Sequence, residues 1–172
     1  NHITQIGGVT YFWADDGVTD HELWKTDGTA AGTVMVKDIC PPGFTPSLGT
    51  PFVEFQNKVY FGACDGIHGG ELWRTNGTES GTFMVGDTCP GMCGMIAEDS
   101  CDLPPDSMTV IGNRLYFRSH TGQFELWKTN GTLDGTVMVR DINPFGSSYP
   151  AMITDVFGVA YLWADDGNHG RE

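Results

Sequence analysis

The sequence predicts an all-β fold made of β-propeller-like repeats, each a blade of four antiparallel strands. A Glu-Leu-Trp motif begins at Glu22, Glu71 and Glu125, and the glutamate that begins it occurs a fourth time as Glu172. The steps between these glutamates are 49 (71 − 22), 54 (125 − 71) and 47 (172 − 125) residues. A period near 50 is typical of repeat architectures such as propellers. The chain is also rich in glycine, with 24 in 172 residues, and no window keeps a helical spacing of apolar residues beyond one turn.

The first half of each period predicts a tight hairpin. An apolar run is followed by a two-residue turn and then by a strand that carries a tyrosine. The residue three positions before that tyrosine is Gly8, Asn57, Asn113 or Gly158. Glycine and asparagine tolerate the positive φ angle that such a turn requires. We therefore expect a strand–turn–strand element in all four copies.

The second half of each period predicts another hairpin. The Glu-Leu-Trp strand leads into a loop of the form Asp/Asn-Gly-Thr-x-x-Gly-Thr, and a Val-Met-Val-like strand follows. Alternation along the strand places Leu23 and Lys25 on one face and Trp24 and Thr26 on the other. The aromatic side chains are expected to fill the core of the blades.

Seven hairpins, or about three and a half blades, are predicted in a single array covering residues 1–172. They begin near residues 3, 22, 52, 71, 108, 125 and 152. The units are approximately 1–45, 46–105, 106–147 and the partial unit 148–172. Because the sequence starts and stops inside a repeat, we expect either a mature product or a window of a longer repetitive chain.

These motifs resemble the bacterial ELW-x-x-DGT repeat family. Residues 32–39 and 163–172 match the continuation of that family's consensus, and the resemblance covers nearly the whole chain. It implies large secreted or surface proteins with propeller-like β repeats and no assigned catalytic activity. The chain departs from the pattern in its five cysteines, in an insertion between Pro90 and Pro105, and in Asn76 and Asn130, which replace aspartate.

The composition restricts the classes of partner. A formal net charge of −13 argues against nucleic acid and anionic membranes, which both require a basic surface. No apolar run approaches the roughly 18 residues of a membrane span. We expect an extracellular protein, either secreted or at the cell surface.

The cysteines predict disulfides in an oxidising compartment, with free thiols as the alternative. The Cys89-x3-Cys93 spacing lacks the second pair of ligands that would indicate zinc. We expect at least one disulfide to involve the insertion, but the sequence does not determine the pairing. The five candidates are Cys40, Cys64, Cys89, Cys93 and Cys101.

Two copies of the repeat loop are N-glycosylation sequons. They are Asn76-Gly77-Thr78 and Asn130-Gly131-Thr132, and glycans are therefore expected partners. The alternative is that each asparagine only serves the turn, as Asp27 does in the first copy.

The loops that precede each glutamate contain aspartates that could bind calcium, which takes six to eight oxygen ligands. The third copy, residues 119–122, carries no acid, and this favours a simple turn. No other cofactor is expected. The candidate calcium ligands are Asp15, Asp16, Asp65, Asp165 and Asp166.

No catalytic constellation is evident in the sequence, so we do not expect an enzyme. The hypothesis is a structural protein that assembles head to tail with copies of itself, in a filament, fibril or surface layer. Tyr11, Tyr161 and Trp163 are expected at the joining ends. The alternative is a carbohydrate- or calcium-binding propeller module of a surface adhesin.

Overall fold

A computed structural model describes residues 3–19, 21–40, 50–88, 106–120 and 122–172. This part of the chain folds into β-strands alone and contains no helix. The strands form three four-stranded sheets and one two-stranded sheet, all antiparallel. The predicted all-β class is thereby confirmed. No helix long and apolar enough to cross a membrane occurs within these ranges.

Each sheet is a meander whose strands pair in chain order. The first sheet contains β1 (Thr4–Ile6), β2 (Val9–Asp15), β3 (His21–Thr26) and β4 (Val34–Lys37). The second contains β5 (Val53–Phe55), β6 (Lys58–Cys64), β7 (Gly70–Thr75) and β8 (Phe83–Gly86). The third contains β9 (Asp106–Ile111), β10 (Arg114–His120), β11 (Phe124–Thr129) and β12 (Val137–Arg140). The fourth contains β13 (Ala151–Val156) and β14 (Val159–Trp163).

In three of the four sheets, the first turn has the positive φ angle at the residue where the residue types predict it. Gly8, Asn57 and Gly158 have φ angles of 81°, 56° and 83°. The expectation for Asn113 is wrong, because in the third sheet it is the preceding Gly112 (φ 58°) that adopts the left-handed conformation. The position of the hairpin was therefore predictable, whereas its turn geometry was not in every copy.

The third and fourth strands of each complete sheet share an irregularity. The register shifts at the Leu-Trp step of β3, β7 and β11, which is the signature of a β-bulge. A bulge strengthens the local twist of the strands. The three complete sheets thus have the same irregularity at the same residues of the repeat.

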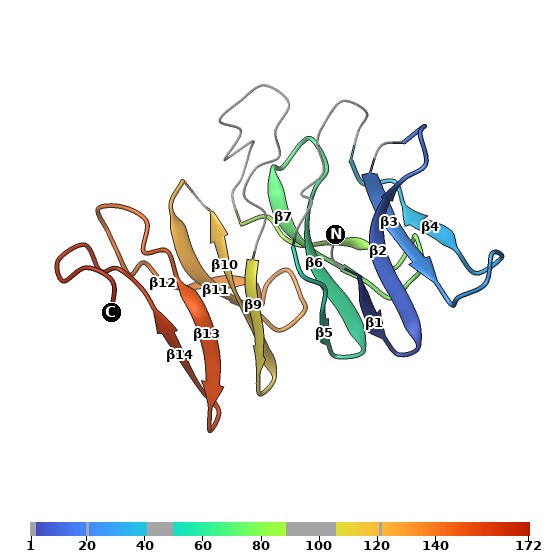
Figure 1. Cartoon of the computed structure of the whole chain (residues 1–172). Coiled ribbons are helices and arrows are strands. Elements are labelled where there is room, and N and C mark those ends of the chain that lie inside the picture. The colour runs from blue at the N-terminus through green and yellow to red at the C-terminus, as the bar shows by residue number, and fades with distance from the viewer. Residues whose placement is uncertain (1–2, 20, 41–49, 89–105, 121) are drawn as a thin grey trace.

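The four sheets lie in a row in chain order, from β1–β4 at one end to β13–β14 at the other (Figure 1). The hydrophobic clusters lie between successive sheets. We call the face that contacts the next sheet along the chain the forward face, and the opposite face the backward face. The first cluster joins Tyr11, Trp13 and Leu23 of the first sheet to Phe61 and Trp73 of the second.

The other two clusters follow the same rule. Tyr60 and Leu72 lie on the forward face of the second sheet and pack against Leu115 and Phe117 on the backward face of the third. Leu126, on the forward face of the third sheet, belongs to a cluster with residues of the fourth sheet and of the segment before it: Ile153, Ala160, Leu162 and Ile142. Alternation along each strand therefore separates a forward set of side chains from a backward set, as the sequence predicted for residues 23–26.

Candidate functional site

The repeat loop is a compact hydrogen-bonded turn. In the second copy, the Gly77 N–H donates to Thr75 Oγ1 (2.9 Å), and Thr75 Oγ1 lies 2.6 Å from Thr82 Oγ1. Thr82 Oγ1 donates to the Thr78 carbonyl (2.7 Å), so the Thr75 hydroxyl is the donor to Thr82. The first and third copies repeat these contacts. The polar residues that recur in the three copies of the repeat therefore stabilise the turn in which they lie.

The two sequon asparagines take part in this turn through their oxygens. Asn76 Oδ1 accepts from the backbone N–H (3.0 Å) and the hydroxyl (2.7 Å) of Thr78. Asn130 makes the same two contacts with Thr132, and Asp27 makes them with Thr29. The Nδ2 atoms, to which a glycan would be attached, have no hydrogen bond to any described residue. In the structure both asparagines therefore stabilise their turns, and glycosylation stays a prediction.

The repeat glutamates have a role that sequence reasoning missed. Glu22, Glu71 and Glu125 are fully buried. Each carboxylate accepts the backbone N–H of the residue 17 positions later: Ile39 (2.6 Å), Thr88 (2.8 Å) and Ile142 (3.0 Å).

These glutamates fasten the third strand of each sheet to the segment that leaves the sheet. Glu125 also accepts the N–H (3.1 Å) and the hydroxyl (2.7 Å) of Ser148, just before β13. Glu71 accepts the Thr88 hydroxyl, which lies 2.7 Å from Ser119 Oγ of the third sheet. A buried carboxylate is tolerated only when hydrogen bonds replace its hydration. The equal spacing in three copies indicates a structural tie.

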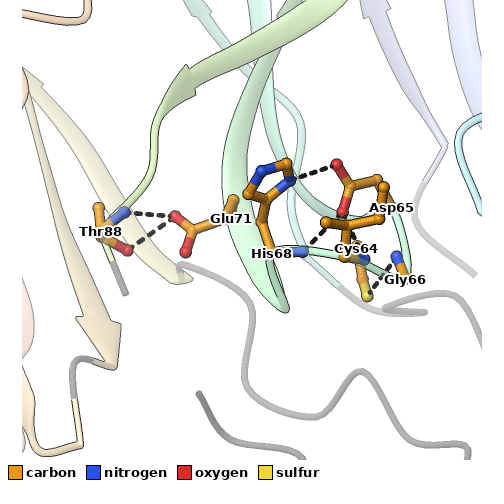
Figure 2. Close-up of polar contacts among 7 residues, drawn as sticks. Cys64, Asp65, Gly66, His68, Glu71 and Thr88 are labelled. Carbon is orange, nitrogen blue, oxygen red and sulfur yellow. Dashed lines mark hydrogen bonds and ion pairs between the residues drawn. The ribbon is translucent and has the colours of Figure 1, made fainter. Parts of the chain in front are cut away.

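The aspartate loop before β7 is closed by its own side chains (Figure 2). Asp65 Oδ1 accepts the backbone N–H groups of Ile67 and His68, both at 2.9 Å, and Asp65 Oδ2 lies 2.7 Å from His68 Nδ1. The Gly66 N–H points to Cys64 Sγ at 3.3 Å. In Figure 2, dashed contacts join Glu71 to Thr88 and join the loop residues to one another.

The other aspartate loops have the same construction. Asp166 Oδ1 accepts two backbone N–H groups, and its Oδ2 lies 2.7 Å from His169 Nδ1. Asp16 accepts the N–H groups of Val18 and Thr19. The aspartates one position earlier, Asp15 and Asp165, each accept the backbone N–H of the glycine two residues later, Gly17 and Gly167.

These contacts bear on the calcium hypothesis. The loop aspartates direct oxygens to N–H groups of their own turns, and within the described ranges no three His, Cys, Asp or Glu residues gather in a way that could hold a metal ion. The third copy, without an acid, instead packs His120 against Phe124, with ring centroids 4.8 Å apart. The arrangement fits turn formation, which was the alternative to calcium binding.

The aspartate–histidine pairs shift the histidine pKa values. The hydrogen bond to the Asp65 carboxylate raises the pKa of His68, and the one to the Asp166 carboxylate raises the pKa of His169. Burial raises the pKa of Asp65, but its hydrogen bonds with His68 and Ile67 outweigh this effect and leave the pKa lowered. Burial lowers the pKa of His120, which has no such acid beside it.

Two of the five cysteines lie in the described part of the chain, and both are buried. The Cys40 N–H donates to Glu22 Oε1 (3.0 Å). Cys64 is disulfide-bonded, although no disulfide joins two described residues. The candidates Cys89, Cys93 and Cys101 lie outside the described residues.

The forward face of the fourth sheet is apolar and open. Tyr161 and Trp163 on β14 are 59% and 51% exposed. With Met152, Val156 and other residues they line a hollow of about 460 Å³. The expectation that Tyr11 also lies at an open end is wrong: it is 5% exposed, since Phe52 and the second sheet cover the forward face on which it lies.

Successive sheets are also joined by what we call a glycine latch, in which a basic residue of one sheet donates to the carbonyl of the loop glycine of the next, and a tyrosine hydroxyl lies close to that glycine. Lys25 Nζ donates to the Gly77 carbonyl (2.7 Å), and a Cβ at position 77 would lie 2.8 Å from the Tyr11 hydroxyl. The next latch repeats this geometry: Arg74 Nη1 donates to the Gly131 carbonyl (2.7 Å), and a Cβ there would lie 2.6 Å from the hydroxyl oxygen of Tyr60.

The residues that recur in every copy thus hold turns, sheets and the joints between sheets. Among the described residues, the forward face of β13–β14 is an apolar face that no other sheet covers. No family model, no curated protein and no solved structure matches this chain.

Proposed function

We propose that this is a non-enzymatic structural repeat protein that assembles end to end with copies of itself. The observation that carries the proposal is the exposure of equivalent tyrosines on successive forward faces. Tyr11 and Tyr60 are 5% and 0% exposed, whereas Tyr161 is 59% exposed. The next sheet covers the forward faces of the first two sheets and part of that of the third, where Tyr116 is half-buried, and the last face has the same kind of side chains without a cover.

The first sheet presents a surface of the type that covers such faces. Phe12 pairs across strands with Trp24, as Phe61 pairs with Trp73 and Phe117 with Trp127. In the second and third sheets this Phe–Trp pair is the backward face that packs on the preceding sheet. The backward face of the first sheet therefore complements the forward face of the fourth sheet of another copy.

Two unlike faces that complement each other make a heterologous contact, which yields a ring if the rotation closes and a filament if it does not. We favour a filament, fibril or surface layer, because the four sheets form an open row (Figure 1). A propeller-like arrangement of the sheets belongs to the same proposal, and the resemblance to ELW-x-x-DGT repeats supports it.

The setting that we propose is extracellular, secreted or at the cell surface. The disulfide-bonded Cys64 supports an oxidising compartment. The two sequon loops leave Nδ2 of Asn76 and Asn130 available, so we expect glycans on both in a cell that has the machinery. Peptide mass spectrometry of protein from its native source tests this, and unmodified asparagine at both positions would count against it.

The assembly is tested by sedimentation velocity over a range of protein concentrations. We expect the native chain to form species of increasing mass, and the double variant Tyr161→Lys/Trp163→Lys to stay monomeric because it places two charges on the open face. Val18→Lys is the matched control, since Val18 is exposed in a loop of the first sheet. A native chain that stays monomeric, or a double variant that assembles like the control, would contradict the proposal.

A carbohydrate-binding adhesin module is the alternative function. The hollow between the first and second sheets has polar side chains, including Glu54, Asn57 and Asn76, beside Tyr11. Its volume of about 280 Å³ falls just below the usual 300–1,000 Å³ of ligand sites, which makes this alternative the weaker one. Quenching of tryptophan fluorescence by a sugar panel, abolished by Asn57→Ala, would favour it.

A further inference from the structure

The hollow between the first and second sheets is lined by one of the two sequon asparagines. The first sheet contributes Ile6, Gly7 and Tyr11 to its lining, and the second sheet contributes Asn76. Asn76 is exposed, and its Oδ1 accepts the hydrogen bonds of Thr78, whereas a glycan would be attached to Nδ2. Glycosylation changes Nδ2 alone, so a sugar on Asn76 leaves the turn intact and begins at the edge of the hollow.

The equivalent space at the next joint contains a side chain of the repeat itself. Gly7 follows the last residue of β1, as Gln56 follows the last residue of β5. A Cβ on Gly7 would meet nothing within 4 Å. The Gln56 side chain reaches the loop of the third sheet, where its Oε1 would lie 3.1 Å from a Cβ on Gly131. A glutamine therefore occupies the second joint, beside Asn130, whereas the first joint has a hollow beside Asn76.

The lining of the hollow matches the surface of a sugar ring. Ile6 and Val9 supply apolar surface for the C–H groups of the ring, and Asn57 and Lys58 supply polar groups for its hydroxyls. Tyr11 is 5% exposed, and no described residue hydrogen-bonds to its hydroxyl. A nearly buried hydroxyl without a protein partner is a group that a sugar hydroxyl can satisfy.

We propose that the first sugar of a glycan on Asn76 packs into this hollow and joins the first sheet to the second, whereas a glycan on Asn130 extends into solvent. The volume of about 280 Å³ is small for a free ligand. A tethered sugar has an effective concentration on the order of millimolar, so weak contacts are enough to hold it. The inference rests on the glycosylation in the proposed function and names where one of the two glycans binds.

The test uses the full chain made in a cell with N-glycosylation machinery and trimmed by an endoglycosidase that leaves one N-acetylglucosamine on each modified asparagine. NMR should show nuclear Overhauser contacts between the sugar on Asn76 and the side chains of Ile6 and Tyr11. The sugar on Asn130 is the internal control and should show no contact with the second sheet.

The matching variant is Gly7→Gln, which copies into the first joint the residue that occupies the second. The backbone accepts it, because Gly7 has a φ angle of 59° and Gln56 has one of 53°. The contacts between the sugar and the first sheet should be lost. Gly8→Asn is the control, since it adds a side chain to the same turn at a position that does not line the hollow, and the contacts should persist.

A second variant removes the glycan and keeps the turn. Asn76→Asp cannot be glycosylated, and Asp27 shows that an aspartate makes the same turn contacts. Amide hydrogen exchange in the β1–β2 turn should be at least about threefold faster in this variant than in the glycosylated chain. Asn130→Asp makes the same change of charge and should leave these amides unaffected. In protein from a cell without the machinery, Asn76→Asp should have no effect on them.

The outcomes separate this inference from the proposed function. A sugar on Asn76 without contacts to the first sheet, contacts that persist in Gly7→Gln, or equal exchange in the two aspartate variants would overturn the inference and leave the proposed glycosylation standing. An unmodified Asn76 would end the inference together with the proposed glycosylation of that site. Assembly is measured separately by sedimentation, and a monomeric chain whose sugar fills the hollow would contradict the assembly alone.

Discussion

At the scale of single residues, the buried glutamates carry the most structural information. Glu125 accepts three hydrogen bonds, from the Ile142 backbone and from the backbone and hydroxyl of Ser148. It holds β11, the segment after β12 and the start of the fourth sheet together. Its removal leaves buried donors without partners, which costs more than the loss of the bonds alone.

We therefore expect Glu125→Ala to lower the free energy of unfolding by about 3 kcal/mol. Chemical denaturation measures this loss. Glu54→Ala is the control, because Glu54 is exposed and a substitution there should change stability by less than about 0.5 kcal/mol. Equal effects of the two substitutions would contradict the role of a structural tie.

The glutamate tie could not be read from the sequence, although its spacing of 17 residues is constant. In all three copies the carboxylate binds a backbone N–H, and every residue except proline carries that group. The partner therefore leaves no signature in residue type. The turn role of Asp27, Asn76 and Asn130 could be predicted, because a side chain that bonds to its own backbone two residues on depends only on local sequence.

A second prediction at this scale concerns the Asp65–His68 pair. The raised pKa of His68 means that its contribution to stability is full below the ordinary value of 6.5 and is lost as the pH rises through the raised value. The lowered pKa of Asp65 means that its contribution is full above the ordinary 3.8 and is lost as the pH falls through the lowered value. The pair stabilises the fold most between these two ordinary values.

An NMR titration of the histidine rings checks this. We expect a pKa above 6.5 for His68 and a lower one in Asp65→Asn, which cannot ionise. His120, whose pKa burial lowers, serves as the internal control and should titrate identically in both proteins. A His68 pKa that does not move in Asp65→Asn would refute the pairing.

At the scale of elements, the loop glycines meet two different demands. Gly28 and Gly131 have nearly the same φ angle, 91° and 89°. A Cβ at position 28 would meet nothing within 4 Å, whereas one at position 131 would approach Tyr60. The comparison of the two separates backbone strain from steric conflict.

We expect Gly28→Ala to cost about 1–2 kcal/mol from the left-handed backbone. Gly131→Ala should cost about 2 kcal/mol more, because the latch between the second and third sheets must open. Thermal unfolding of the two variants gives the difference. Equal losses would mean that Tyr60 moves aside freely and that the latch contributes nothing to the joint.

Which strands exist could be predicted from the sequence, since apolar alternation and turn residues recur in each period. The bulges at the Leu-Trp steps could not, because the extra residue depends on how two strands twist around each other and not on a residue preference. Asn113 shows the same limit for turns: its type permits a positive φ angle but does not require one.

At the scale of the whole molecule, the cores lie between sheets and not within one closed interior. The sequence placed Tyr11 at an open end because the first hairpin has no hairpin before it. Because side chains alternate between the two faces along β2, Tyr11 lies on the forward face, and the second sheet covers it. The backward side of the first sheet carries Phe12 and Trp24 instead, and both are half-buried. The order of the hairpins along the chain could be predicted from the sequence. Which face of a sheet packs against the next sheet became clear only from the packing.

The disulfide of Cys64 is tested on the whole chain, because no disulfide joins two described residues. Intact mass after alkylation, with and without reductant, counts the bonds. We expect fewer than five alkylated cysteines without reductant, and we expect Cys64→Ala to lower the free energy of unfolding by about 2–4 kcal/mol. Five alkylated cysteines in the unreduced protein would contradict this.

The meander order of the sheets has a consequence for how the protein is made. Every described strand pairs with its neighbours in sequence, so the strand pairing of a sheet needs no residue that is translated later than its own fourth strand. A chain emerging from the ribosome can close the first sheet while the third is still being synthesised, and domains made from the N-terminus onward generally fold in that order. Each finished sheet then offers its forward face as a template on which the next one folds, so synthesis and stacking proceed in the same direction.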